Sequence, residues 1–263
     1  MDQATITSKR NERIRDAKQL KQKKYRDQHG LFLLEGVRLV EEALATPYTD
    51  TVFFTSRLLE APRGRELLAQ AEKKNVSSFL CSDEVFSELI ETVQSQGVVA
   101  VACKPTWPLF CSGLILVADG VSDPGNMGTL LRTGLAAGCR GLLVMEGSVD
   151  LYNPKVLRSS MGAIFHLPHW MLTRDEALTL IQRQQSTLVI ADLTDSEVHW
   201  DVRYPQNIAV VIGNEAHGVH PRFRDAADLR VQIPLLGSVE SLNASVAAGI
   251  LLYEIQRQHR SEN

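Results

Sequence analysis

Three loops in the second half of the chain gather glycine, asparagine, glutamate and serine directly after apolar runs. They cover residues 119–128, 213–218 and 233–243, and the first leads into a helical stretch that carries Arg132. Glycine lets the backbone turn tightly and approach a ligand, whereas asparagine, glutamate and serine side chains offer hydrogen bonds. Open parallel sheets bind ligands where their strands end. The three loops therefore predict a ligand site.

Several of these polar residues also have an ordinary structural explanation. Ser241 and Asn243 are suited to cap the N-terminus of the last helix, and Asn126 lies at or near the start of another. Glu215 precedes a short helix at Pro221, where an acidic residue is favoured by the helix dipole. Taken one at a time, these residues do not separate capping from chemistry.

The first loop alone also fits a dinucleotide-binding turn. Glu146 ends the next strand about 20 residues after Gly125, where a Rossmann fold places its ribose-binding acid. The glycines disagree, because that fingerprint is GxGxxG and this loop offers only Gly125 and Gly128. A nicotinamide-dependent oxidoreductase is therefore a weaker alternative from a different class.

Together the three loops resemble the signature motifs of the SpoU/TrmH RNA 2′-O-ribose methyltransferases of the SPOUT superfamily. The motifs read N-x-G-x-x-x-R-T at residues 126–133, G-N-E-x-x-G at 213–218 and I-P-x-x-G-x-x-E-S-L-N-x-S-V-A at 233–247. They occur in the order that the family has. Residues 33–44, after a basic segment, also resemble the opening of the family's substrate-binding domain.

The resemblance implies an S-adenosylmethionine-dependent methyltransferase that modifies a ribose 2′-hydroxyl in structured RNA. It also implies a parallel sheet with a trefoil knot, and a homodimer through the C-terminal domain whose active site is built from both subunits. The hydrophobic periodicity of the chain does not predict a knot, since knotted chains are rare exceptions. We expect the SPOUT methyltransferase domain at residues 109–263 and a small L7Ae-like α/β RNA-binding domain at residues 1–104.

By the same resemblance, the cofactor contacts are Gly213, Ile233 and Leu242. Contact mostly with the backbone is plausible chemistry for this cofactor. An adenine ring needs a flat apolar slot with a few fixed hydrogen-bonding groups. Gly213 allows close approach, and Ile233 and Leu242 supply apolar walls.

The resemblance also implies that Arg132 is the central catalytic residue, with Asn126, Glu215, Ser241 and Asn243 orienting it and the ribose. A ribose hydroxyl is a weak nucleophile until its proton is removed or its developing charge is stabilised. Because a guanidinium stays protonated in proteins, we expect Arg132 to bind the adjacent phosphate and stabilise the alkoxide rather than act as the base.

Two further expectations concern the remaining chemistry of the chain. His217 is an alternative base at neutral pH, although it occupies a variable position of the second motif. The four cysteines, Cys81, Cys103, Cys111 and Cys139, form no CxxC pair, so we expect buried free thiols and no metal site.

The elements that must position these loops follow from the hydrophobic pattern. Two prolines at residues 105 and 108 mark a linker. Before it, strands are expected at residues 31–34, 51–55, 76–80 and 98–103, with helices at 37–45, 63–74 and 83–90. After it, strands are expected at 114–119, 141–145, 188–191, 208–212 and 229–233, with helices at 126–137, 153–161, 175–185 and 243–258. This alternation predicts a second, mostly parallel sheet covered on both faces.

The first domain begins with a concentrated positive charge. Residues 9–26 hold nine Lys or Arg against Glu12 and Asp16, although the whole chain has a net charge of −3. Apolar residues every third position predict one narrow-faced helix at residues 14–25. Its charge predicts either an RNA-phosphate contact or a solvated helix face.

The long basic N-terminal domain favours a large structured RNA, such as ribosomal RNA, as the partner. A tRNA ribose methyltransferase and a non-catalytic RNA-binding protein of the same fold are the alternatives. The hydrophobic share of 44% and charged share of 22% are typical of globular proteins. With no apolar run of membrane-spanning length and no signal-like start, we expect a cytoplasmic protein without a membrane partner.

Overall fold

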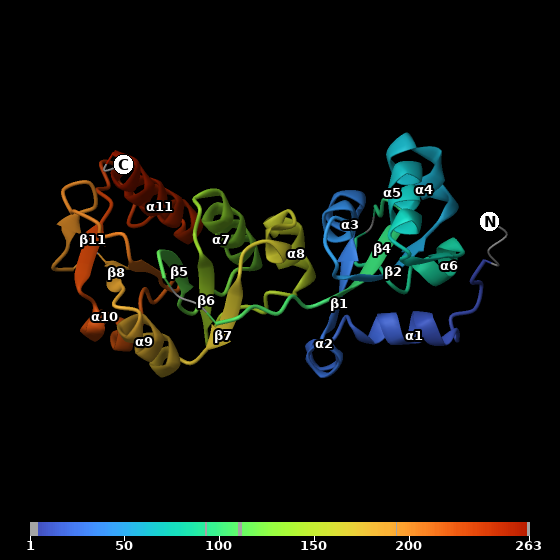
Figure 1. Cartoon of the computed structure of the whole chain (residues 1–263), viewed down its shortest axis with the longest axis horizontal. Coiled ribbons are helices and arrows are strands. Elements are labelled where there is room, and N and C mark those ends of the chain that lie inside the picture. Colours follow the sequence, from blue (N-terminus) through green and yellow to red (C-terminus); the bar gives the residue numbers. More distant parts are fainter. Residues whose placement is uncertain (1–4, 93, 110–111, 193, 262–263) are drawn as a thin grey trace. The chain divides into compact units, whose positions relative to one another are not determined.

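The computed structural model describes residues 5–92, 94–109, 112–192 and 194–261 (Figure 1). The chain forms two compact units. Unit 1 comprises Met1–Pro105 together with Tyr152–Phe165, and unit 2 comprises Thr106–Leu151 and His166–Asn263. The segment Tyr152–Phe165 thus belongs structurally to unit 1, although it interrupts the part of the sequence expected to form the second domain.

Unit 1 contains a four-stranded mixed sheet in the order β1-β4-β2-β3. Strand β4 runs antiparallel to both neighbours, whereas β2 and β3 are parallel. The strands are β1 (Leu31–Glu35), β2 (Thr49–Phe54), β3 (Ser77–Leu80) and β4 (Val98–Cys103). All four were predicted, because each is a short apolar run next to turn residues.

Helices pack on both faces of this sheet. Helices α3 (Val37–Leu44) and α5 (Pro62–Lys73) contact it on one side. On the other, buried Ile14 and Ala17 of α1 (Glu12–Gln19) meet Phe53 and Val99, together with α6 (Asp83–Phe86). The short helix α4 (Ser56–Glu60) was not predicted.

The expectation of one basic helix at residues 14–25 is wrong. The segment forms α1 and a second helix, α2 (Lys23–His29), which ends at Gly30 in the left-handed conformation with φ of 66°. Leu20 follows the stripe of Ile14 and Ala17 into the core and is 4% exposed. The helix stops there, because the chain must turn to bring α2 back against β1.

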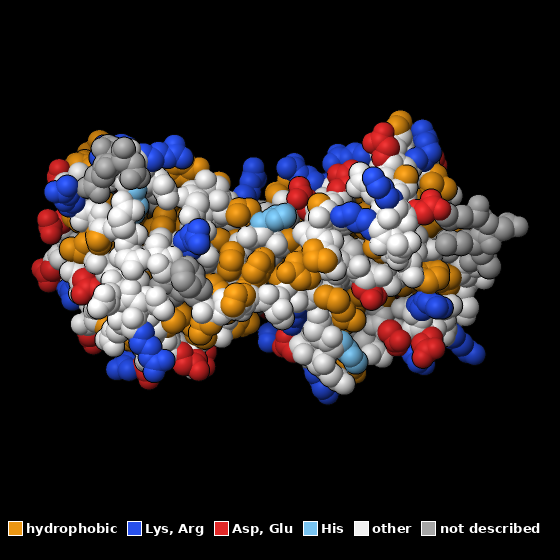
Figure 2. Space-filling model, viewed as in Figure 1, with side chains coloured by type: hydrophobic (Ala, Val, Ile, Leu, Met, Phe, Trp, Pro, Cys, Tyr) orange, Lys and Arg blue, Asp and Glu red, His pale blue; other side chains and the backbone are white. Residues whose placement is uncertain are grey.

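Much of the positive charge in this segment is engaged within unit 1. Lys9 and Lys18 form ion pairs with Glu88, and Lys23 pairs with Asp27 at 2.8 Å. On the face shown in Figure 2, basic and acidic side chains are interspersed over unit 1. The charge excess read from the sequence is therefore partly neutralised in the folded unit.

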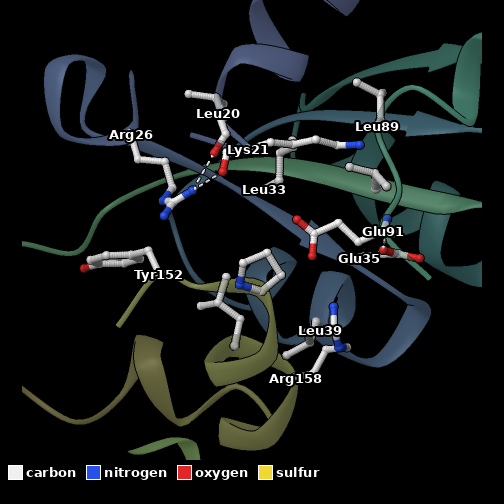
Figure 3. Close-up of a pocket in the computed structure, with 13 residues that line it drawn as sticks. Leu20, Lys21, Arg26, Leu33, Glu35, Leu39, Leu89, Glu91, Tyr152 and Arg158 are labelled. Carbon is white, nitrogen blue, oxygen red and sulfur yellow. Dashed lines mark hydrogen bonds between the residues drawn. The ribbon is translucent and has the colours of Figure 1, made fainter. Parts of the chain in front are cut away.

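One of the nine cations lies in the interior. Arg26 is 5% exposed, and its guanidinium donates to the backbone carbonyls of Leu20 at 2.9 Å and Lys21 at 2.8 Å, where α1 ends (Figure 3). These bonds satisfy carbonyls that the end of a helix leaves unpaired. The cavity beside them is about 20 Å³, which is room for about one water molecule.

The segment Tyr152–Phe165 packs on unit 1 through aromatic rings. It contains α8 (Pro154–Ser160) and the short 3₁₀ helix η1 (Ala163–Phe165). The Phe32 ring of β1 lies 4.7 Å from that of Tyr152 and 5.9 Å from that of Phe165, measured between centroids. Removing the rest of unit 1 would expose these rings, so the segment depends on it for burial.

Unit 2 contains a seven-stranded sheet in the order β7-β6-β5-β10-β8-β11-β9, and every neighbouring pair is parallel. The prediction of a parallel sheet in an α/β fold is confirmed. The strands are β5 (Leu114–Ala118), β6 (Gly141–Met145), β7 (His169–Leu172), β8 (Thr187–Ala191), β9 (Glu197–Val198), β10 (Ile208–Ile212) and β11 (Leu229–Gln232). Strands β7 and β9 were not predicted.

Two pairs of helices cover this sheet (Figure 1). Helices α7 (Pro124–Ala136) and α11 (Ala244–Ser261) pack against each other on one face. Helices α9 (Arg174–Arg183) and α10 (Pro221–Ala226) cover the other, where Ile181 and Phe223 enter the core. The central strands are buried on both sides, which explains their continuous apolar sequences.

A buried carboxylate ties three segments together at one edge of the sheet. Asp119, directly after β5, is 1% exposed. It accepts hydrogen bonds from Arg174 Nε at 2.8 Å and from the backbone N–H of His220 at 2.7 Å. The starts of α9 and α10 are thereby fixed to the carboxyl end of β5.

Two smaller findings complete the fold. Cys81 and Cys139 are buried free thiols as expected, but Cys103 is exposed at the end of β4, and Cys111 lies outside the described residues. Among the described helices, none combines the length and apolar character that crossing a membrane requires.

Arg26→Met should lower the free energy of unfolding by about 1–3 kcal/mol, because it leaves buried carbonyls without a donor. Lys24→Met is the matched control, since Lys24 lies on the same helix but is exposed. Urea unfolding of both variants measures the difference. Equal stabilities would contradict a structural role for Arg26.

Candidate active site

The register of the parallel strands brings the predicted loops to one edge. Ala118 at the end of β5 pairs with Ile212 at the end of β10, so the first and second loops start side by side. Asn214 then links them, because its side-chain amide donates to the carbonyl of Gly120 at 2.7 Å. The prediction that these loops meet at the carboxyl ends of the strands is confirmed.

The second loop closes on itself so tightly that its first residue must be glycine. Asn214 and Gly218 exchange two backbone hydrogen bonds of 2.9 Å each, and Gly218 has φ of 68°. A Cβ on Gly213 would lie 2.3 Å from the carbonyl carbon of Gly218. Glycine at position 213 therefore allows the loop to close, and it also leaves the backbone accessible to a ligand in the pocket.

A chain of side-chain hydrogen bonds joins all three loops. Asn243 donates through Nδ2 to Oδ1 of Asn126 at 2.8 Å, and Asn126 donates through Nδ2 to Oε1 of Glu215 at 2.9 Å. Asn243 also caps α11, since its Oδ1 accepts from the backbone N–H of Ser245 at 2.9 Å. Asn243 therefore has the capping role and also belongs to the network.

Glu215 is the acceptor at the centre of this network. It also accepts from the backbone N–H and hydroxyl of Ser122, at 3.2 and 3.1 Å, and from the N–H of Asp123 at 3.3 Å. Partial burial acts to raise the pKa of Glu215. Hydrogen bonds from Asn126 and the backbone outweigh it and lower the pKa from 4.5 to about 2. Glu215 is thus an anion at neutral pH and a poor proton acceptor.

A pocket of about 720 Å³ opens between the loops that follow β8, β10 and β11. All three predicted cofactor residues line it: Gly213, Ile233 and Leu242. The predicted catalytic residues Glu215, Ser241 and Asn243 line it too. The pocket therefore combines apolar walls with a few polar groups, as small-molecule sites do.

Three charged residues of the pocket were not among the predicted site residues: Glu240, an exposed acid of the third motif loop, and the pair Asp192 and Arg224. Asp192 follows β8 directly, and Arg224 lies on α10; both line the pocket. The only sequence signal for Asp192 is an acid immediately after a buried strand. Arg224 carries none, because the helix that presents it is short and its buried side chain is that of Phe223.

The other two predicted catalytic residues lie outside the pocket lining. Asn126 is connected to it through Glu215 and Asn243. Arg132 is exposed on α7, and within the described part of the chain its guanidinium makes no hydrogen bond or ion pair. A single copy of the chain therefore does not bring Arg132 together with the residues expected to orient it.

The residues behind the two alternative chemistries also lie elsewhere. Glu146 and Gly125, on which the dinucleotide-binding interpretation depended, do not line the pocket. His217 is exposed, and its Nδ1 lies 3.0 Å from Oδ1 of Asn214. The geometry thus favours neither a Rossmann-type site nor His217 as a buried base.

Two family models match the chain. The model of the SpoU rRNA Methylase family matches residues 113–253, and that of the MRM3-like substrate binding domain matches residues 11–100. The first covers the sheet of unit 2 and all three loops. The second covers β1 to β3 of unit 1 and the start of β4.

The chain is also similar to individual proteins over nearly its whole length. It is 32% identical to the 23S rRNA (guanosine(2553)-2′-O)-methyltransferase RlmP of Bacillus subtilis, covering 95% of this chain and 98% of that protein. A crystal structure of an RNA 2′-O ribose methyltransferase matches with a TM-score of 0.82 and 32% identity, covering 98% of this chain and all of that one.

A third match includes the cofactor. The SpoU methyltransferase AviRb from Streptomyces viridochromogenes, crystallised in complex with AdoMet, has a TM-score of 0.84 and 30% identity, and the match covers 96% of this chain and 99% of that chain. The loops, their motifs and these matches agree. The chain belongs to the SpoU rRNA methylase family.

Proposed function

We propose that the protein is an S-adenosylmethionine-dependent methyltransferase that methylates a ribose 2′-hydroxyl in ribosomal RNA. The observation that carries this proposal is the pocket lined by the second and third motif loops, which the Asn243–Asn126–Glu215 network ties to the first loop. The similarity to RlmP, which extends over both units, supports ribosomal RNA as the substrate.

The residues of the pocket fit this cofactor. Its volume of about 720 Å³ lies within the range of small-molecule sites. Ile233 and Leu242 offer apolar walls for the adenine, and Gly213 leaves backbone groups accessible. When bound, S-adenosylmethionine supplies an electrophilic methyl group. The protein's own task is to hold the ribose and stabilise charge on its 2′-oxygen.

Arg132 is assigned to that task. A guanidinium binds phosphate through several N–H donors and remains protonated, so it stabilises an alkoxide without accepting its proton. Within its own chain Arg132 has no partner among the described residues. This leaves its donors available for an RNA phosphate.

We further propose a homodimer in which Arg132 of one copy serves the pocket of the other. The position of Arg132 outside its own pocket supports such a shared site. Helices α7 and α11 also expose apolar side chains that a partner would cover: Leu135, Val246 and Tyr253 are 37%, 51% and 55% exposed. A two-fold dimer would bury the same patch on both copies.

The proposed topology of unit 2 is a trefoil knot. Strand β10 lies between β5 and β8, although β8 precedes it in the chain, and the loops after β10 and β11 meet at one edge. This order supports a C-terminal segment that passes through an earlier loop.

The proposed RNA-binding domain comprises residues 1–104 and is of the L7Ae-like kind. The proposed methyltransferase domain comprises residues 109–263, of which Tyr152–Phe165 packs with unit 1. The match of residues 11–100 to a substrate-binding domain supports the first assignment. The proposed location is the cytoplasm, as expected from the sequence, because a ribosomal RNA substrate would be met there.

Glu215→Gln should reduce stability at neutral pH, with a deficit that shrinks as the pH falls. The pKa of Glu215 is lowered to about 2 in the folded protein. Its contribution is therefore full above pH 4.5, the usual value, and is lost as the pH falls toward 2. Urea unfolding across this range measures the difference from wild type. Glu240→Gln, which changes an exposed acid in the same pocket, is the control; a pH-independent Glu215→Gln deficit would contradict the assignment.

Arg132→Ala should lower single-turnover methyl transfer by roughly 10²–10³-fold, the usual cost of removing a donor to a developing oxyanion. The affinity for S-adenosylmethionine should stay within a few-fold of wild type, since Arg132 does not line the pocket. Arg183→Ala, on the exposed part of α9, is the control. Near-normal transfer by Arg132→Ala would remove Arg132 from the mechanism.

Mixing variants tests whether the site is shared. An Arg132→Ala copy combined with a Leu242→Arg copy, whose own pocket is filled, yields heterodimers with one complete site. Random exchange should then restore about a quarter of wild-type activity, because half of the dimers are mixed. No recovery after subunit exchange, confirmed by native mass spectrometry, would mean that each copy uses its own Arg132.

Charge reversal on unit 1 tests RNA binding. The test must avoid cations that stabilise the folded unit. Lys18 forms an ion pair with Glu88, and Lys21 and Arg26 donate hydrogen bonds to backbone carbonyls, so these three are not changed.

Arg10, Arg15 and Lys24 are exposed, and among the described residues the Arg15 guanidinium pairs only with its exposed neighbour Asp16, at 3.9 Å. Their triple change to Glu should therefore weaken RNA binding. The slope of log affinity against log salt should fall by roughly 0.7–0.9 for each RNA phosphate that the variant no longer neutralises.

The control carries the same change of net charge at exposed residues elsewhere: Lys73→Glu, Arg140→Glu and Arg183→Glu. Binding of S-adenosylmethionine should be unchanged in both triple variants. If the two triples lose RNA affinity equally, only net charge matters, and the basic segment does not bind RNA specifically.

A further inference from the structure

Asp192 and Arg224 form an ion pair inside the pocket that the motif loops build. Arg224 Nε lies 2.8 Å from Asp192 Oδ2, and the Asp192 side chain is 7% exposed, whereas that of Arg224 is 42% exposed. Both residues line the pocket. Burying a carboxylate costs free energy unless a cation or hydrogen-bond donors compensate its charge, and this one lies beside a space large enough for a ligand.

The local structure holds this carboxylate in place. The N–H of Asp192 donates to the carbonyl of Val231 at 3.0 Å, which continues the pairing of β8 with β11. Its Oδ1 accepts from the N–H of Thr194 at 3.1 Å. The Arg224 guanidinium lies beside Gly218, where an added Cβ would be 4.0 Å from its Nη2. The pair therefore joins the loop after β8 to helix α10.

A second pair involving the same helix provides a comparison. Arg222, two residues before Arg224, pairs with Asp175 of α9, but their side chains are 60% and 71% exposed and neither lines the pocket. Exposed ion pairs of this kind contribute little to the stability of the fold. The burial and position of Asp192 are thus not general properties of acids near α10.

We propose that Asp192 accepts hydrogen bonds from the ribose hydroxyls of the cofactor, and that Arg224 is a positioning residue that holds Asp192. This inference rests on the proposed function, in that the pocket must bind S-adenosylmethionine. An ionised carboxylate only accepts hydrogen bonds and has about four lone-pair sites. Thr194 donates to Oδ1, whereas the buried Oδ2 meets Arg224 as an ion pair and accepts no hydrogen bond from the described residues. The vicinal hydroxyls of a ribose supply two donors.

The position of Asp192 in the sheet supports the same assignment. In open parallel sheets, an acid at the carboxyl end of a strand is well placed to accept from a nucleotide's ribose hydroxyls. Asp192 directly follows β8 and shares the pocket lining with the apolar residues Ile233 and Leu242. The pocket thus offers apolar surface for a base and a carboxylate for a sugar.

The test is calorimetric binding of S-adenosylhomocysteine and of its 2′,3′-dideoxyribose analogue to the full chain. Asp192→Ala should weaken binding of S-adenosylhomocysteine by roughly tenfold to a hundredfold, the effect of losing hydrogen bonds to a charged acceptor. Its affinity for the dideoxy analogue should match that of wild type, since no hydroxyl is left to bind. Asp192→Asn, which keeps the shape and one acceptor oxygen, should recover part of the loss.

The controls separate the roles of the two residues. Asp175→Ala should leave both affinities unchanged. Arg224→Gln should weaken S-adenosylhomocysteine more than the dideoxy analogue, and Arg224→Lys should restore part of the difference, because a cation again faces Asp192.

Two results would overturn the inference. One is wild-type affinity of the folded Asp192→Ala and Asp192→Asn variants for S-adenosylhomocysteine. The other is an equal loss for both ligands, which would assign Asp192 to a different group of the cofactor. If wild-type protein fails to bind S-adenosylhomocysteine, the proposed function itself fails, and this result is distinct from the other two.

Discussion

The hydrogen bonds from Asn243 to Asn126 and from Asn126 to Glu215 are the constraint on which the site depends. Each of the three residues belongs to a different motif loop, so the chain of bonds fixes the loops relative to one another. Asn243 also caps α11, and Glu215 also binds the turn before α7. The arrangement of the pocket is therefore coupled to the start of both helices on that face of the sheet.

This network is built from residues that are poorly suited to proton transfer. The lowered pKa of Glu215 keeps it anionic, and the two asparagines do not titrate. By contrast, Arg132 has no partner among the described residues. The division is physically reasonable, because a rigid hydrogen-bonded frame holds the pocket while an unpaired cation remains available for a charged substrate. Asp119 has a comparable framing role at the end of β5.

Unit 1 shows why charge counted along a sequence overstates what a surface presents. Arg26 is buried at the end of α1, and Lys18 and Lys23 are paired with acids. The same unit takes up Tyr152–Phe165 from the middle of the chain through contacts with Phe32. The unit is consequently joined to the rest of the protein at more than one point of the sequence.

The sequence by itself determined the α/β class, the order of most strands and the three motif loops, because buried parallel strands are continuous apolar runs and the motifs are local patterns. It did not reveal β7, a four-residue strand in which Trp170 and Leu172 are only partly buried, or the break between α1 and α2. Tertiary structure alone decided that Glu215 joins Asn126 and Asn243, that Arg132 stands apart from its own pocket, and that Asp192 meets Arg224. These relations connect residues far apart in the chain, and only the register of the sheet brings their strand ends together.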